Sequence, residues 1–143
     1  MNKSKTAAVQ ELKSHLRRFV VDLLVSNYEA TEEVGLNSND LASLCLLLRH
    51  GAAPAGRLAE LTGLTTGAVT GLVDRLEDAG FVHREPDPEH RRKVIVVPDR
   101  VRVERDLFPH FPSLQLAARA EYYDEFSVAE LEVITAFLRG LRA

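Results

Sequence analysis

The apolar residues of the first thirty positions recur at steps of three and four, which is the spacing of one face of an α-helix. We therefore predict a helix from residue 5 to about residue 31. At ~1.5 Å per residue this helix would be about 40 Å long, which is longer than the core of so small a chain needs. The residues of this face are Val9, Leu12, Leu16, Phe19, Val20 and Leu23.

A second helix is predicted after a polar, glycine-bearing break at residues 34–39. It should run from residue 40 to about residue 50, with Ser38 or Asn39 as its N-cap and Gly51 just past its end.

A short helix and a longer one are predicted next, separated by a tight turn. Pro54 suits the first position of the short helix, and Gly63 ends it. Thr65 or Thr66 can cap the following helix, which Gly80 closes.

Two β-prone runs, residues 81–85 and 93–97, then predict a hairpin with a charged loop that contains two prolines. Helix-prone residues follow from 99 to about 125, with a break expected at Pro109 and Pro112. Ser127 and Glu130 form a capping-box pattern that opens a last helix. Its apolar face carries Leu131, Ile134, Leu138 and Leu141.

This order predicts a mainly α fold with a small β-hairpin, and residues 40–98 follow the plan of a winged helix-turn-helix. In the helix after residue 65, the apolar side should pack on Leu58, Leu61 and Leu64. That apolar side comprises Val69, Leu72, Val73 and Leu76, and the opposite side offers Thr66, Gly67, Thr70, Gly71, Asp74 and Arg75.

Small hydroxyl and glycine residues at the start of a helix suit close approach to DNA, since threonine contacts base edges or a thymine methyl. Each glycine costs about 1 kcal/mol inside a helix, so Gly67 and Gly71 call for a reason such as close approach to DNA or to another helix. An ordinary solvent-exposed helix surface is the alternative interpretation of the same residues.

The end of the hairpin loop reads His90-Arg91-Arg92-Lys93, and such a cationic tip can reach the minor groove. Residues 54–98 hold six basic and seven acidic residues and are therefore near neutral overall. Their positive charge is concentrated at the end of the loop. A solvated hairpin of mixed charge is the alternative. The basic residues are Arg57, Arg75, Arg84, Arg91, Arg92 and Lys93, and the acidic ones are Glu60, Asp74, Glu77, Asp78, Glu85, Asp87 and Glu89.

The composition is that of one globular domain: 143 residues, 45% hydrophobic, with a net charge of −3. The single cysteine, the lack of an export signal and the lack of a membrane-spanning run lead us to expect a cytoplasmic protein. We expect no metal site, because the cluster of His83, Asp87, Glu89 and His90 lacks a second ligand set at zinc-type spacing. We expect no catalysis or cofactor, because the sequence has no Ser/Cys-His-acid arrangement, phosphate-binding glycine loop or dinucleotide fingerprint.

Residues 58–97, LAELTGLTTGAVTGLVDRLEDAGFVHREPDPEHRRKVIVV, resemble the DNA-binding core of the MarR family of multiple-antibiotic-resistance-type regulators. FSVAEL at 126–131 resembles the start of the family's last helix. The resemblance implies one domain over residues 1–143, with dimerisation helices in 1–33 and 99–143 and a DNA-binding region in 40–98. It also implies a homodimeric transcriptional regulator, expected to be a repressor, on a palindromic operator.

The DNA-contacting residues expected on this basis are Thr65, Thr66, Gly67, Thr70, Gly71, Arg75, Arg91, Arg92 and Lys93. Two positions depart from the family pattern. His90 stands where an acidic residue usually orients the wing arginine, so that brace is either missing or supplied by Asp87 or Glu89, and either wing arginine is a candidate for the groove. Pro98 stands where the second strand usually ends in threonine, and it removes a backbone donor.

Many family members release DNA when a small phenolic or amphipathic effector binds between the dimerisation helices and the winged helix. The candidate effector residues here are His15, Phe19, Arg49, His50, Phe108 and His110, each of which core packing or surface exposure also explains. Cys45, in an apolar run, is expected to be a small core residue rather than a redox sensor. A winged helix used for protein–protein interaction, without DNA, is the alternative function.

Overall fold

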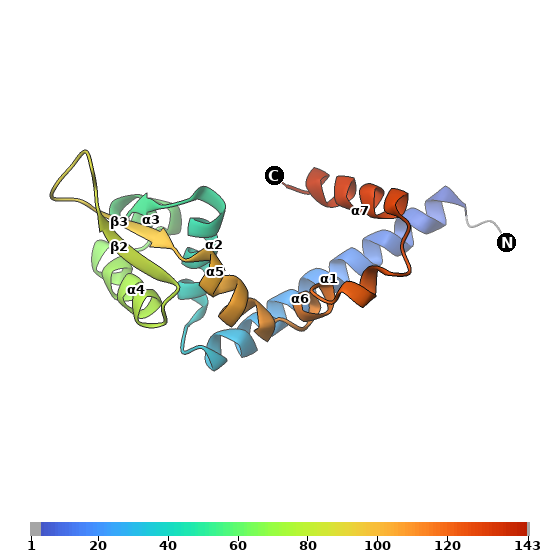
Figure 1. Ribbon diagram of the computed structural model, residues 1–143, viewed down its shortest axis with the longest axis horizontal. Helices are drawn as coiled ribbons and strands as arrows, with labels where there is room; N and C mark the ends of the chain where they lie inside the picture. Colours follow the sequence, from blue (N-terminus) through green and yellow to red (C-terminus); the bar gives the residue numbers. More distant parts are fainter. Residues whose placement is uncertain (1–3, 143) are drawn as a thin grey trace. The chain divides into compact units, whose positions relative to one another are not determined.

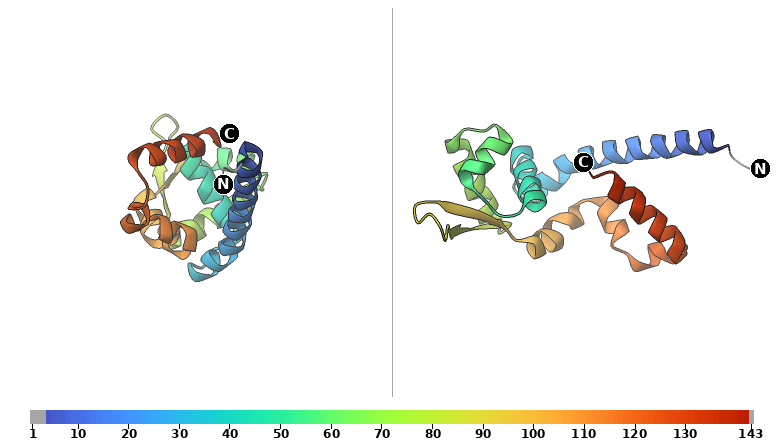
Figure 2. Two further views of the ribbon diagram at one scale, coloured as in Figure 1. Left: turned by 90° about the vertical axis from the view of Figure 1, so that its right-hand side faces the viewer. Right: turned by 90° about the horizontal axis from the view of Figure 1, so that it is seen from above.

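The computed structural model describes residues 4–142 and divides into two compact units, one ending at Phe111 and one beginning at Pro112. The first unit opens with α1 (Lys5–Glu33), which the Ser4 side chain caps (Figure 1). Only Ala30 and Thr31 of α1 are buried. The N-terminal half of α1 extends away from the other elements of its unit (Figure 2), so its apolar residues meet solvent in the single chain.

Helix α2 (Ser38–His50) is capped by Asn37, which corrects the predicted cap at Ser38 or Asn39. The reason is Asp40, whose backbone N–H donates to the Asn37 side chain while its carboxylate accepts the Asn37 N–H, both at 3.0 Å. This reciprocal capping box places the helix start one or two residues earlier than predicted. Gly51 ends α2, as expected.

Helices α3 (Ala55–Thr62) and α4 (Thr66–Asp78) form the predicted helix-turn-helix. Gly63 ends α3 in the left-handed conformation, at φ 69°, which glycine adopts without steric penalty. Thr65 rather than Thr66 caps α4. Pro54 lies just before α3 and not at its first position, because it belongs to strand β1 (Ala53–Pro54).

The sheet has three antiparallel strands in the order β1-β3-β2. Strands β2 (Val82–Pro86) and β3 (Val94–Pro98) make the predicted hairpin, and β1 pairs with the free side of β3. Strand β1 was not predicted from the sequence, because two residues carry no detectable period. Figure 1 shows the β2–β3 loop projecting beyond the helices of its unit. We call β2, β3 and their loop the wing, and residues 90–93 the wing tip.

One hydrophobic core holds α2, α3, α4 and the sheet together. Leu58 and the four apolar residues of α4 are buried in it, as predicted, whereas Leu61 and Leu64 are half-buried. Gly80 leads from α4 into the wing at φ 80°, and the Arg102 side chain lies 2.8 Å from where a Cβ would stand. A non-glycine residue at Gly80 would be strained by the positive φ, and the flexible end of the Arg102 side chain would have to shift.

Beyond β3 the first unit ends in a short irregular helical stretch. Asp99 caps α5 (Arg100–Arg102), which continues through the π-turn η1 (Val103–Leu107) and the 3-10 turn η2 (Phe108–His110). Pro98 remains in the ladder opposite Val82, and the Asp99 N–H donates to the Phe81 carbonyl at 2.9 Å. The wing thus keeps an ordered connection to α5, although Pro98 has no backbone N–H to donate.

The second unit comprises α6 (Pro112–Ala117), the 3-10 turn η3 (Ala120–Tyr123) and α7 (Val128–Gly140). The break predicted at Pro109 and Pro112 is confirmed, since a 3-10 turn precedes α6. The predicted capping box of Ser127 and Glu130 is also confirmed. None of the described side chains of this unit is buried, although many are large and apolar.

Candidate nucleic-acid interface

Helix α4 separates its two sides cleanly. Its apolar side is buried in the core, and its opposite side is exposed except for Gly71, which is half-exposed. We call this opposite side the outer face of α4. It consists of Thr66, Gly67, Thr70, Gly71, Asp74 and Arg75.

The three threonines at the start of α4 differ in what their hydroxyls already do. The Thr65 hydroxyl accepts the Ala68 N–H at 3.3 Å and so caps the helix. The Thr70 hydroxyl donates to the Thr66 carbonyl at 3.0 Å, which occupies its proton within the helix. Thr70 therefore offers its methyl group and its oxygen lone pairs to a partner, whereas Thr66 makes no side-chain hydrogen bond to any described residue.

The two glycines of the outer face have different surroundings. A Cβ at Gly67 would meet no atom within 4 Å, so packing within the chain does not explain this glycine. A Cβ at Gly71 would lie 3.5 Å from Nη1 of Arg75. A Cβ at Gly71 would thus be in ordinary van der Waals contact with an arginine that lies along the helix, while a Cβ at Gly67 would face only open space.

Arg75 is bound to a residue that the sequence analysis did not single out. Its Nε donates to Oδ2 of Asp40 at 2.9 Å and its Nη2 donates to Oδ1 at 2.8 Å. The Asp40 side chain is 0% exposed and that of Arg75 is 47% exposed. The hydrogen bond to Asp40 raises the pKa of Arg75, so this guanidinium is always charged. No sequence signal pairs these residues, which lie 35 positions apart.

Two of the three acidic residues of α4 pair with one arginine of the wing. Arg84 of β2 donates through Nη2 to Asp74 at 2.6 Å and through Nη1 to Glu77. These contacts raise the pKa of Arg84, with the bond to Asp74 contributing most. They also join α4 to β2 and reduce the negative charge near the outer face.

The wing loop is held by Asp87, one of the two residues proposed as a substitute brace. Its carboxylate accepts the Glu89 N–H at 2.8 Å and lies 3.6 Å from Nδ1 of His90. The Glu89 N–H lowers the pKa of Asp87, and the nearby His90 and Lys93 act in the same direction. Asp87 thus braces the backbone of the turn rather than an arginine.

The cations of residues 54–98 fall into two groups. Arg57, Arg75 and Arg84 are engaged by carboxylates. Arg91, Arg92 and Lys93 are exposed and form no ion pair within 4.0 Å to any residue in 4–142. A region of near-zero net charge therefore presents its uncompensated positive charge at the wing tip.

The comparisons with known proteins agree with this architecture. Residues 36–94 match the model of the MarR family. The uncharacterised HTH-type transcriptional regulator YcgE of Bacillus subtilis is 42% identical over 111 residues, which cover 76% of this chain and 70% of that protein. The chain belongs to the MarR family.

Solved MarR-like structures share the fold. Transcriptional regulator Tm0710 of Thermotoga maritima superposes with a TM-score of 0.61 at 23% identity, covering 92% of each chain. A point mutant of MepR from S. aureus, solved bound to an oligodeoxyribonucleotide, superposes with a TM-score of 0.57 at 18% identity, covering 90% of this chain and 94% of that one. The protein is thus a winged-helix transcriptional regulator of the MarR family.

The six candidate effector residues of this MarR-family chain are only partly brought together. His15 and Phe19 are exposed on α1, and Arg49 and His50 are exposed at the end of α2. Phe108 and His110 are half-buried in η2, which contacts α1. None of the six lines the hollows described for residues 4–142, so their effector role remains a prediction.

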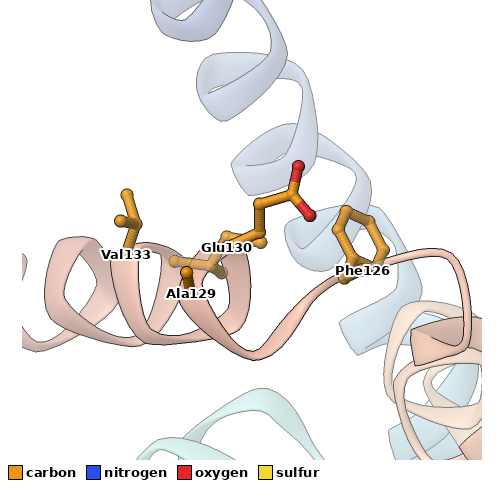
Figure 3. A pocket seen from close by; sticks show the side chains of 5 residues that line it. Phe126, Ala129, Glu130 and Val133 are labelled. Carbon is orange, nitrogen blue, oxygen red and sulfur yellow. The ribbon is translucent and has the colours of Figure 1, made fainter.

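A shallow hollow of about 430 Å³ lies on α7 instead. It is lined by Phe126, Ala129, Glu130, Val133 and Ile134 (Figure 3). The Glu130 carboxylate accepts the Ser127 N–H at 2.8 Å within the capping box of α7. The other lining residues are apolar. The hollow has the character of an uncovered packing surface rather than of a polar binding site.

Cys45 differs from its prediction, because it is exposed in the single chain and is not a core residue. It lies on the side of α2 that the core leaves open. Partial desolvation raises the pKa of its thiol, which disfavours the reactive thiolate. Within residues 4–142, no helix is both long and apolar enough to cross a bilayer, and no three potential ligand side chains gather at a metal site.

Proposed function

We propose that this chain acts as a homodimer that binds a two-fold symmetric duplex and represses transcription there. The outer face of α4 enters the major groove, and the wing tip follows the adjacent minor groove. The contacts come from Thr66, Gly67 and Thr70, from Arg75, and from Arg91, Arg92 and Lys93. Thr65 acts indirectly, by capping α4, and Gly71 lies beside the Arg75 guanidinium.

The single observation that carries the proposal is the separation of charge in the winged unit. Arg84 pairs with Asp74 of the outer face and with Glu77 beside it, while Arg91, Arg92 and Lys93 have no carboxylate partner within 4.0 Å among residues 4–142. Phosphate neutralisation by lysine and arginine supplies most of the affinity for duplex DNA. The chain therefore needs no overall positive charge to bind it.

Dimerisation is supported by the apolar residues that the single chain leaves exposed. On α1, Leu24 is 60% and Tyr28 is 70% exposed, and α7 has no buried residue. Apolar patches of this kind in a water-soluble chain indicate an interface. A second copy is the occupant we propose, because a two-fold dimer presents two α4 helices and two wings to a palindromic duplex.

Repression follows from occupancy, since a dimer bound across an operator excludes other proteins from the same duplex. Release by a small amphipathic effector is the finer part of the proposal and is supported only by the family resemblance. A protein-interaction module remains the second candidate function, favoured by the near-neutral winged segment and by His90 in place of an acidic residue.

Selection of bound duplexes from a random oligonucleotide pool tests the proposal. We expect a palindromic site whose half-site centres lie about 34–36 Å apart. A salt titration on that duplex should then show steep loss of affinity, and Arg92→Ala should flatten the slope by about one unit. Arg105→Ala is the matched control, since it removes the same charge from a residue paired with Asp106 outside the interface.

The second candidate function gives the opposite result. If the wild-type protein binds no duplex at low salt, the near-neutral winged unit serves protein–protein interaction and the DNA-binding proposal is wrong. If Arg92→Ala and Arg105→Ala change the slope equally, the wing tip makes no special contact.

A further inference from the structure

Asp40 is a fully buried carboxylate with an unusual set of partners. Its side chain accepts the Asn37 N–H, which caps α2, and it accepts two N–H groups of Arg75 from α4. A buried charge is tolerated only when it is paired and hydrogen-bonded, and this one is both. The start of α2 and the last turn of α4 are thereby joined at one carboxylate.

Arg75 reaches Asp40 by lying along its own helix. Helical side chains lean toward the N-terminus, so a residue covers the surface about one turn before it. The guanidinium accordingly passes Gly71, with Nη1 3.5 Å from the Cβ position there. Nε and Nη2 are taken by Asp40, which leaves Nη1 without a hydrogen bond to any residue in 4–142.

We propose that Asp40 is a positioning residue for operator binding, which holds Arg75 beside Gly71 with Nη1 directed to a phosphate oxygen of the duplex. The proposal rests on the DNA-binding function proposed above. A two-bond contact fixes the planar guanidinium in one orientation, so less side-chain freedom is lost when the duplex binds. Gly71 borders the held guanidinium, whose Nη1 lies 3.5 Å from the Cβ position of that residue.

Two roles of Asp40 predict opposite effects of Asp40→Asn on DNA affinity: one through its negative charge, the other through the position in which it holds Arg75. Asp40→Asn removes a negative charge near the DNA, so charge alone predicts tighter binding to every duplex. Loss of position predicts weaker binding to the operator, because Arg75 is no longer held. A merely structural role predicts neither, since the folded fraction of the variant would bind as the wild type does.

The test is a double-mutant cycle of wild type, Asp40→Asn, Arg75→Gln and the double variant. Each is titrated by fluorescence anisotropy with the selected operator and with a scrambled duplex of equal length. Circular-dichroism melts set a working temperature well below every midpoint. We expect Asp40→Asn and Arg75→Gln each to weaken operator binding about tenfold.

The remaining expectations separate this proposal from its rivals. Asp40→Asn should leave scrambled-duplex affinity unchanged or raise it, and the double variant should be no weaker on the operator than Arg75→Gln. Arg75→Lys keeps the charge but cannot reproduce the paired bonds, so it should behave like Asp40→Asn and decides the matter if Asp40→Asn does not fold.

Three results would overturn the positioning role while the wild-type protein still binds its operator. They are unchanged operator affinity in Asp40→Asn, full additivity of the two single effects, or operator affinity in Arg75→Lys equal to the wild type. A wild-type protein that binds no duplex would instead remove the proposed function itself, and that is visible before any variant is made.

Discussion

The winged part of the first unit buries many of its apolar side chains, whereas the helical second unit leaves its described apolar side chains exposed or half-buried. The winged part buries leucine and valine from α2, α3, α4 and β3 in one closed core. The second unit, with α7 as its longest helix, buries none of its described side chains. One region therefore has a closed core of its own, whereas the apolar residues of the other are left uncovered in the single chain.

This contrast assigns different roles to similar residues. Leu76 on α4 is 0% exposed and Leu24 on α1 is 60% exposed in the single chain. Burial of a leucine contributes about 2 kcal/mol, so leaving a row of such residues in water is unfavourable. The exposed rows on α1 and α7 are the surfaces that the proposed dimer would cover.

The largest expected effect is on assembly. Leu138→Glu places a charge on the exposed apolar face of α7 and should weaken dimerisation by about 100-fold or more, because a buried unpaired charge costs several kcal/mol. Sedimentation equilibrium measures this directly. Glu132→Gln, on the opposite side of α7, is the matched control and should leave the dimer intact. If Leu138→Glu assembles normally, α7 lies outside the interface.

Two leucine-to-alanine substitutions, one in the closed core and one on α1, should lower the free energy of unfolding in different ways. Leu76→Ala should cost about 2–5 kcal/mol at any protein concentration, because it opens a cavity in the closed core. Leu24→Ala should cost little in a monomer but more where the dimer is populated. Urea unfolding at two protein concentrations separates the cases. Equal, concentration-independent losses would show that α1 packs within one chain.

Gly67→Ala tests whether the outer face of α4 is kept open for a partner. The added methyl meets no atom within 4 Å, so helix propensity should raise the free energy of unfolding by about 1 kcal/mol. Operator affinity should fall nonetheless, because the methyl occupies space that the duplex approaches. Thermal melts and anisotropy titrations measure the two quantities. A variant that gains stability and keeps full affinity would show that Gly67 lies outside the contact.

The smallest expected effect concerns the wing loop and pH. The pKa of Asp87 is lowered in the folded state, so its stabilising contribution is present above its ordinary pKa of 3.8 and is lost as the pH falls below that value. Asp87→Asn should therefore be slightly less stable than the wild type at pH 7 and equal to it at pH 2–3. Glu89→Gln, at the exposed neighbouring position, is the control. A difference between wild type and Asp87→Asn that persists at pH 2–3 would have another cause.

The sequence by itself determined the order and type of most elements. Helical and alternating periodicity located α1, α3, α4, α7 and the β2–β3 hairpin, and glycine, proline and capping residues located their ends to within a few positions. These signals are local, because the residues that produce them lie within a turn or a hairpin of one another. The cationic wing tip was visible for the same reason.

Only the tertiary structure decided which charges remain available and where the short strand lies. Strand β1 exists because β3 offers it a free edge, and Arg75 is held because Asp40 approaches it from 35 residues away. Arg84 likewise neutralises Asp74 across the join between α4 and β2. Such pairings depend on how elements pack, and no spacing along the chain records them.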